Sequence, residues 1–108
     1  MKGLILIIVI IWDDEKDREN IEKHGISFKD AQYVFDDPAR VERRDDDHSE
    51  EEQRWQTLGF FHDVLFVVFT ERGDDTRLIS ARIAEPKERR IYYGDSTQYP
   101  KGWGRVNP

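Results

Sequence analysis

An acidic segment that carries one histidine is the first place where side-chain types suggest chemistry. In DDDHSEEEQRW, residues 45–55, six of the first eight residues are acidic, yet His48 lies among them and Arg54 follows. A histidine can move a proton near neutral pH, and an arginine can stabilise charge on a phosphate. The alternative is an exposed loop histidine without a role, because charge runs are usually solvated.

Arginines within an apolar segment form the second group. TRLISARIA, residues 76–84, predicts a strand. Strict alternation places the side chains on two faces, which are Leu78, Ser80 and Arg82 on one, and Arg77, Ile79, Ala81 and Ile83 on the other. An arginine in the middle of such a strand either pairs with a carboxylate or borders an open cleft. Both readings remain open from the sequence.

Polar side chains along one side of a predicted helix, residues 14–24, form the third group. They are Asp13, Lys16, Asn20, Lys23 and His24. A solvated helix face is the simpler interpretation. However, Ile21 is the only large apolar residue of this helix, so some of the polar groups are expected to face protein or a partner.

The net charge of −6 argues against a general nucleic-acid binder, because affinity for phosphate comes mainly from Lys and Arg. The charge is unevenly distributed: residues 1–50 contain 14 acids and 8 bases, whereas residues 51–108 contain 9 of each. A local basic face is therefore possible on an acidic protein. The absence of cysteine excludes disulfides and thiolate metal sites.

The sequence predicts no metal site and no cofactor. Asp45, Asp46 and Asp47 are candidates for Mg²⁺, but consecutive aspartates point in different directions, and neither EF-hand spacing nor HExxH is present. The sequence also lacks a GxGxxG motif, a P-loop and a serine-nucleophile motif.

Caps and periodicity predict one α+β domain with a mainly antiparallel sheet of four or five strands. Asp13 or Asp14 opens the first helix and Gly25 ends it, while Ser27 opens the second. The expected helices are 14–24, 28–36 and 86–93, and the expected strands are 4–12, 39–44, 55–62, 64–71 and 76–84. Two helices thus precede the main strands and one follows them. Ser49 and Glu52 have capping-box spacing, which predicts a helical turn before residue 55.

The two ends of the chain are expected to differ. The apolar run Leu4–Trp12 is nine residues long, too short for a membrane span of about 20, and WDDEKDREN follows it instead of a small-residue cleavage site. We therefore expect a buried strand and a cytoplasmic protein. The glycines and prolines of residues 94–108 predict an irregular tail beyond a single domain of residues 1–93.

Four segments in this order resemble the BrnT family of type II toxins. They are WDDEKDRENIEKHGISFKDAQYVFDDP at 12–38, DHSEEEQRWQTLG at 47–59, VLFVVFTERG at 65–73 and TRLISARIAEPKERRIYY at 76–93. KHGISF and ISAR carry most of the specificity. Residues 94–108 lie outside the resemblance, and the apolar N-terminus is longer than the family pattern.

The resemblance implies a RelE-like fold and a metal-independent ribonuclease that inhibits translation. It also implies a hetero-oligomer with a small DNA-binding antitoxin, through which alone the toxin would contact DNA. In this chemistry the ribose 2′-OH attacks the adjacent phosphate in line, a base accepts its proton, and arginines stabilise the phosphoryl oxygens. The alternative is a non-catalytic module that only binds the antitoxin and regulates its operon.

On this interpretation the catalytic candidates are His48 or His24 as the base, with Arg54, Arg77 and Arg82 as the electrostatic clamp. The capped turn would set His48 and Arg54 at the edge of the sheet that carries Arg82. The candidates for binding RNA or the partner are Lys16, Asn20, Lys23, Arg72, Arg89 and Tyr92.

Overall fold

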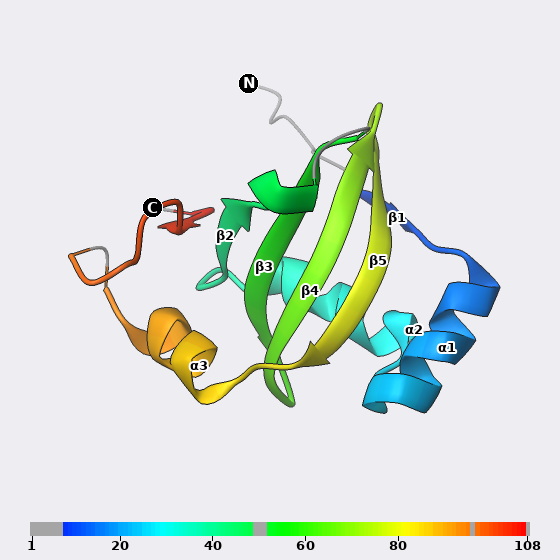
Figure 1. The fold of residues 1–108 in the computed structure, drawn as a ribbon, viewed down its shortest axis with the longest axis horizontal. Helices are drawn as coiled ribbons and strands as arrows, with labels where there is room; N and C mark the ends of the chain where they lie inside the picture. The colour runs from blue at the N-terminus through cyan, green and yellow to red at the C-terminus, as the bar shows by residue number, and fades with distance from the viewer. Residues whose placement is uncertain (1–7, 49–51, 96, 108) are drawn as a thin grey trace, which may run out of the picture.

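The structure, a computed structural model, describes residues 8–48, 52–95 and 97–107 (Figure 1). Its centre is a mixed six-stranded sheet with the strand order β1-β5-β4-β3-β2-β6. The strands are β1 (Val9–Ile11), β2 (Val41–Arg44), β3 (Arg54–Phe61), β4 (Asp63–Arg72), β5 (Asp75–Ile83) and β6 (Gly104–Arg105). The helices are α1 (Asp14–His24), α2 (Phe28–Ala31) and α3 (Pro86–Tyr93), and the 3-10 helices are η1 (Gln32–Asp36) and η2 (Asp46–His48).

The α+β class is confirmed, with differences in detail. The helices expected at 14–24 and 86–93 have the expected bounds, but the helix expected at 28–36 divides into α2 and η1. The sheet has six strands instead of four or five, and β1 runs parallel to β5. None of the helices described combines the length and apolar character needed to cross a bilayer.

Local capping explains where α1 and α2 begin and end. The Asp13 carboxylate accepts hydrogen bonds from the backbone N–H of Glu15 and Lys16, at 2.8 and 3.2 Å. These bonds hold the pKa of Asp13 below its usual value. Gly25 ends α1 in the left-handed conformation, with φ of 72°, where a side chain would be strained. Ser27 caps α2 through Asp30, as predicted.

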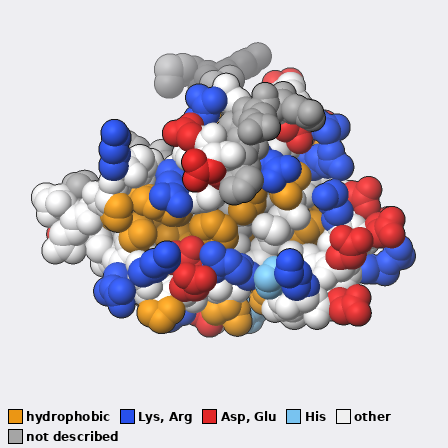
Figure 2. Space-filling view, viewed as in Figure 1, with side chains coloured by type: hydrophobic (Ala, Val, Ile, Leu, Met, Phe, Trp, Pro, Cys, Tyr) orange, Lys and Arg blue, Asp and Glu red, His pale blue; other side chains and the backbone are white. Residues whose placement is uncertain are grey.

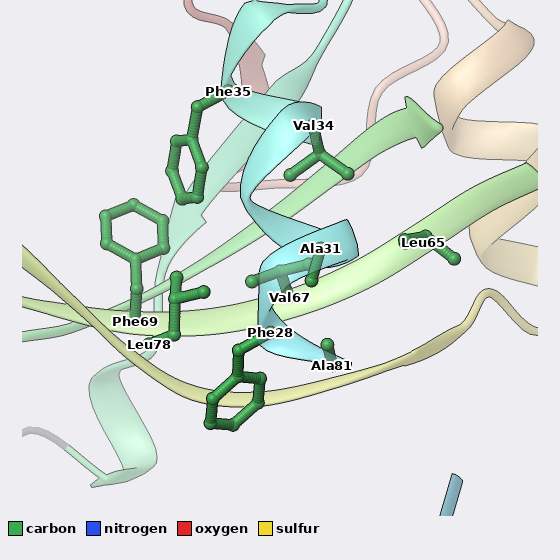
Figure 3. Packing of buried hydrophobic residues seen from close by; sticks show 9 residues of the cluster. All are labelled: Phe28, Ala31, Val34, Phe35, Leu65, Val67, Phe69, Leu78 and Ala81. Carbon is green, nitrogen blue, oxygen red and sulfur yellow. The ribbon is translucent and has the colours of Figure 1, made fainter. Parts of the chain in front are cut away.

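One face of the sheet packs against α2 and η1 (Figure 3). The buried side chains there are Phe28, Ala31, Val34, Phe35, Leu65, Val67, Phe69, Leu78 and Ala81. The 3-10 helix η1 approaches β3 so closely that a Cβ on Gly59 would lie 2.6 Å from the Cβ of Val34. Only glycine permits this approach without a shift of the backbone.

The opposite face packs against α3 and the C-terminal segment, and is turned to the viewer in Figure 1. Its buried side chains are Val41, Leu58, Val64, Phe66, Val68, Ala84 and Trp103. The segment 94–108 was expected to be irregular, but β6 pairs with the edge strand β2 and Trp103 is only 8% exposed. Burial of one aromatic ring stabilises a segment that lacks regular local periodicity.

A β-bulge in β5 overturns the alternation expected for residues 76–84. Val68 of β4 pairs with Ser80, whereas the next residue, Phe69, pairs with Leu78, so Ile79 is an extra residue in β5. Leu78 therefore joins Ala81 in the core beneath α2, while Ile79 packs on the opposite face. Strict alternation fails because a bulge shifts the side chains on one side of it by one position.

Asn20 fastens α1 to the sheet. It is 6% exposed. Its amide nitrogen donates to the carbonyl oxygens of Ile26 and Ala81, both at 2.8 Å, and its amide oxygen accepts from the N–H of Ala81 at 3.1 Å. The side-chain amide of Asn20 is therefore engaged in hydrogen bonds with the protein's own backbone. Asn20 was expected to bind RNA or a partner, and the contacts that the structure shows for it are these structural hydrogen bonds.

We predict that Asn20→Ala destabilises the fold by roughly 2–4 kcal/mol, because both backbone groups of Ala81 lose a buried partner. Chemical denaturation measures the change. Glu19→Ala, an exposed substitution in the same helix, is the matched control and is expected to change stability by less than about 0.5 kcal/mol. Equal stability of the two variants would contradict the role of Asn20.

Candidate functional site

Arginines from three strands share the sheet face that packs against α3. Arg43 lies on β2, Arg54 on β3, and Arg77 and Arg82 on β5. Cross-strand pairs lie on the same face, and Phe66 pairs with Arg82 while Thr70 pairs with both Arg54 and Arg77. We call this surface the arginine face. Figure 2 shows Lys and Arg side chains on both sides of a hydrophobic band, seen from this side.

The bulge at Ile79 brings Arg77 to the arginine face. With strict alternation Arg77 and Arg82 would point to opposite sides of β5, but the extra residue puts both on one side. Arg54 and Arg77 flank Thr70 in a single cross-strand row, so their backbones are about 10 Å apart, two strand spacings. Two guanidinium groups at this separation can converge on one phosphate, because each side chain is long and flexible.

Arg82 is held in a structural ion pair. Its two terminal nitrogens donate to the two carboxylate oxygens of Glu88 at 2.8 and 3.0 Å, and its guanidinium lies 4.2 Å from the ring centroid of Phe66. The Glu88 hydrogen bonds hold the pKa of Arg82 above its usual value. The reading of Arg82 as a paired arginine thus has direct support. Along β4 it lies four residues, about 14 Å, from the row of Arg54 and Arg77.

The backbone of His48 lies near the end of the sheet where the Arg54 row is found. It closes η2, which directly follows β2, and the N–H of Asp45 donates to the carbonyl oxygen of Arg54 at 2.8 Å. The side chain of His48 and the predicted cap at Ser49 lie outside the part that the structure describes. Glu52 pairs with Arg72 at 3.3 Å, which ties the connection to the end of β4.

Helix α1 lies beside β5 (Figure 1). Lys16 and Lys23 are exposed and His24 is half-buried. The charges of Arg77 and Lys16 contribute to the lowered pKa of Asp13, after its two backbone hydrogen bonds. Lys23 and His24 have no described hydrogen bond or ion pair to the arginine face.

Two further binding candidates anchor α3 instead of facing the arginine row. Arg89 forms an ion pair with Asp63, which holds the pKa of Asp63 below its usual value. The hydroxyl of Tyr92 donates to Asp37 at 2.5 Å, and burial, with the carboxylate of Asp37, raises the pKa of Tyr92. Both contacts tie α3 to other elements at the end of the sheet near the β3–β4 turn.

Sequence reasoning missed Arg43, Gln56 and Trp103, which line the arginine face between β2 and α3. Alternation in VERR, residues 41–44, was a usable signal for Arg43, because it puts Arg43 on the same face as the buried Val41. Within the described ranges, no group of three or more His, Asp or Glu side chains is arranged to hold a metal.

We predict that Arg82→Ala destabilises the fold by about 1–3 kcal/mol, because it leaves Glu88, which is 6% exposed, without its charged partner. The double variant with Glu88→Ala is expected to recover part of this loss. Thermal or denaturant melts of the complete double-mutant cycle measure the coupling. Additive losses would show that the pair contributes nothing to folding.

Comparison with known proteins places the chain in a family. The crystal structure of the Brucella abortus ribonuclease toxin BrnT superposes with a TM-score of 0.55 and 26% sequence identity, over 73% of this chain and 99% of that one. A search of curated proteins finds no match. The family described as the ribonuclease toxin BrnT of type II toxin–antitoxin systems matches residues 12–88. The chain therefore belongs to the BrnT family of ribonuclease toxins of type II toxin–antitoxin systems.

Proposed function

We propose that the protein is a metal-independent endoribonuclease that inhibits translation, and that RNA binds across the arginine face. The observation that carries this proposal is the cross-strand row in which Arg54 and Arg77 flank Thr70. On a chain with a net charge of −6, two arginines in one row form a local site for phosphate. In this proposal the exposed Lys16 of α1 also contributes to RNA binding.

The proposed reaction is an in-line transfer within the RNA backbone. The ribose 2′-oxygen forms a bond to the adjacent phosphorus while the bond from phosphorus to the 5′-oxygen breaks. A base accepts the 2′-OH proton, and the 5′-oxygen gains one, which leaves a 2′,3′-cyclic phosphate and a 5′-hydroxyl. Arg54 and Arg77 stabilise the negative charge that builds on the phosphoryl oxygens.

His48 is the proposed base, because η2 places its backbone at the same end of the sheet as Arg54. His24, on α1, is the alternative candidate. The guanidinium of Arg82 donates to both carboxylate oxygens of Glu88. Its contribution to the transition state remains part of the proposal, with Arg54 and Arg77 as the principal groups.

Membership of a type II family implies a protein antitoxin as partner. We propose a small DNA-binding antitoxin that covers the arginine face, forms a hetero-oligomer with the toxin and provides the only contact with DNA. The candidate contacts with the antitoxin are Lys23, which is exposed, and Arg72, which forms an ion pair with Glu52. We also propose that the protein acts in the cytoplasm. Its fold is proposed to be related to that of RelE-like toxins.

We predict that the purified protein cleaves naked single-stranded RNA in the presence of EDTA. Arg54→Ala and Arg77→Ala should each lower the cleavage rate by roughly 10²–10³, the effect of losing one preorganised charge contact. His48→Ala should lower it by roughly 10²–10⁴ if His48 is the base. Timed cleavage of a labelled RNA, with a melt of each variant, measures both activity and folding.

The matched control is Arg18→Ala, which removes the same charge from an exposed position on α1. It should leave the rate within about twofold. Full activity of His48→Ala would exclude His48 and direct attention to His24. No cleavage of RNA by a well-folded protein, together with a stable antitoxin complex, would instead support a non-catalytic module that only binds its partner.

A further inference from the structure

A cleft of about 400 Å³ opens at the α3 end of the arginine face. The sheet supplies Arg43, Gln56 and Phe66, and α3 supplies Glu88 and Ile91. Its size is within the range of pockets that bind small organic groups, about 300–1,000 Å³. It lies on the same face as the row of Arg54 and Arg77 but is displaced from that row along the strands.

The C-terminal segment completes the cleft with Trp103 and Pro100. This segment lies beyond residue 88, where the family match ends. It is held in place by the pairing of β6 with β2 and by a hydrogen bond from the N–H of Trp103 to the carbonyl oxygen of Pro100 at 3.1 Å. This wall of the cleft is therefore a feature of this chain that the family match does not include.

Two guanidinium planes line the cleft. Arg43 lies over the ring of Trp103 at 4.9 Å, and Arg82 lies over the ring of Phe66 at 4.2 Å. Each guanidinium is also held at its edge, Arg43 by the Gln56 oxygen at 2.6 Å and Arg82 by Glu88. The hydrogen bonds at the edge and the cation–π contact hold each planar cation in place, and unpaired RNA bases stack on guanidinium planes.

Gln56 supplies a directed hydrogen-bond donor. Because the Nε of Arg43 can only donate, the side-chain oxygen of Gln56 must face it, and this fixes the orientation of the amide. The amide nitrogen then points away from Arg43, and its N–H groups have no partner among the residues with described positions. A group with an acceptor at its edge, such as a nucleobase, matches these donors.

The charge of the cleft favours a neutral group over a phosphate. Arg43, Arg82 and Lys87 are offset by Glu85 and Glu88, so the lining carries close to one net positive charge. A phosphate would lie near two carboxylates, whereas a base bears no charge. In the proposed binding mode the backbone phosphate therefore lies at the row of Arg54 and Arg77 instead of in the cleft.

We propose that this cleft binds one unpaired base of the RNA substrate, stacked on the guanidinium planes of Arg43 and Arg82. The proposal rests on RNA binding by the arginine face. Phosphates contact the row of Arg54 and Arg77, while the base in the cleft fixes the register of the RNA. Trp103 acts as a positioning residue, because it supports the plane of Arg43.

Binding of uncleavable RNA tests the proposal separately from catalysis. The probes are 2′-O-methyl single-stranded oligomers, each lacking the base at one position, since a methylated 2′-oxygen cannot attack. With the wild-type protein, one abasic position should weaken binding roughly 5- to 100-fold, the range for one stacked base. In Arg43→Lys this difference should disappear, because an ammonium keeps the charge but has no plane.

Trp103→Ala is the second variant and should also lose the difference, with folding checked by a melt. Tyr93→Ala, which removes an exposed aromatic ring of α3 outside the cleft, is the control and should keep it. Equal binding of all abasic probes, or an unchanged difference in both cleft variants, would overturn the proposal.

Cleavage of ordinary RNA by the same preparation separates the two proposals. Cleavage without any effect of an abasic position would support the ribonuclease proposal and contradict the proposal that the cleft binds a base. An abasic effect that depends on Arg43, without cleavage, would support the cleft and remove the nuclease. Failure to bind any of the RNA probes would overturn both.

Discussion

The extra residue at Ile79 is the constraint on which the charged surface depends. Without the bulge, Arg77 and Arg82 would point to opposite sides of β5, and Leu78 would leave the core beneath α2. Thus one local irregularity completes an apolar core on one face and places a second arginine on the other. Bulges commonly re-aim side chains in this way near functional sites. Asn20 binds the backbone of Ala81, two residues beyond the bulge, and so holds this part of β5 against α1.

The arginine face consists of the Arg82–Glu88 pair at the α3 end and the row of Arg54 and Arg77 farther along the strands. At the α3 end, Glu88 neutralises Arg82 and fixes the orientation of its guanidinium. The pair therefore contributes to the stability of the fold and to the shape of the cleft more than to the positive potential of the surface. At the other end, Thr70 separates Arg54 from Arg77 within one row of the sheet. A chain with 23 acidic and 17 basic residues can still present a local group of arginines, because charge interactions are short-ranged at physiological salt. Net charge alone is therefore a poor guide to this surface.

Much of the fold follows from local signals, and most of the site does not. Asp13, Gly25 and Ser27 mark helix ends through contacts within a few residues, so the sequence predicts them well. The bulge depends on pairing between β4 and β5, and the burial of Trp103 depends on a face assembled from distant strands. The ion pair of Arg82 was one of two open readings, because the sequence cannot choose the partner. Short-range chemistry was predictable, whereas contacts that require the assembled sheet were not.

The C-terminal segment couples edge protection to the shape of the site. A β2 strand without β6 would present unpaired backbone groups, which favour association with other chains. β6 pairs with Val41 and Glu42 of that strand, and Trp103, the residue before β6, thereby lies against Arg43. The two-residue strand β6 thus pairs with backbone groups of the edge strand β2 and also positions the ring of Trp103. Changes in this segment would alter the cleft through the position of Arg43, whose cross-strand partner Gln56 lies two residues from Arg54 on β3.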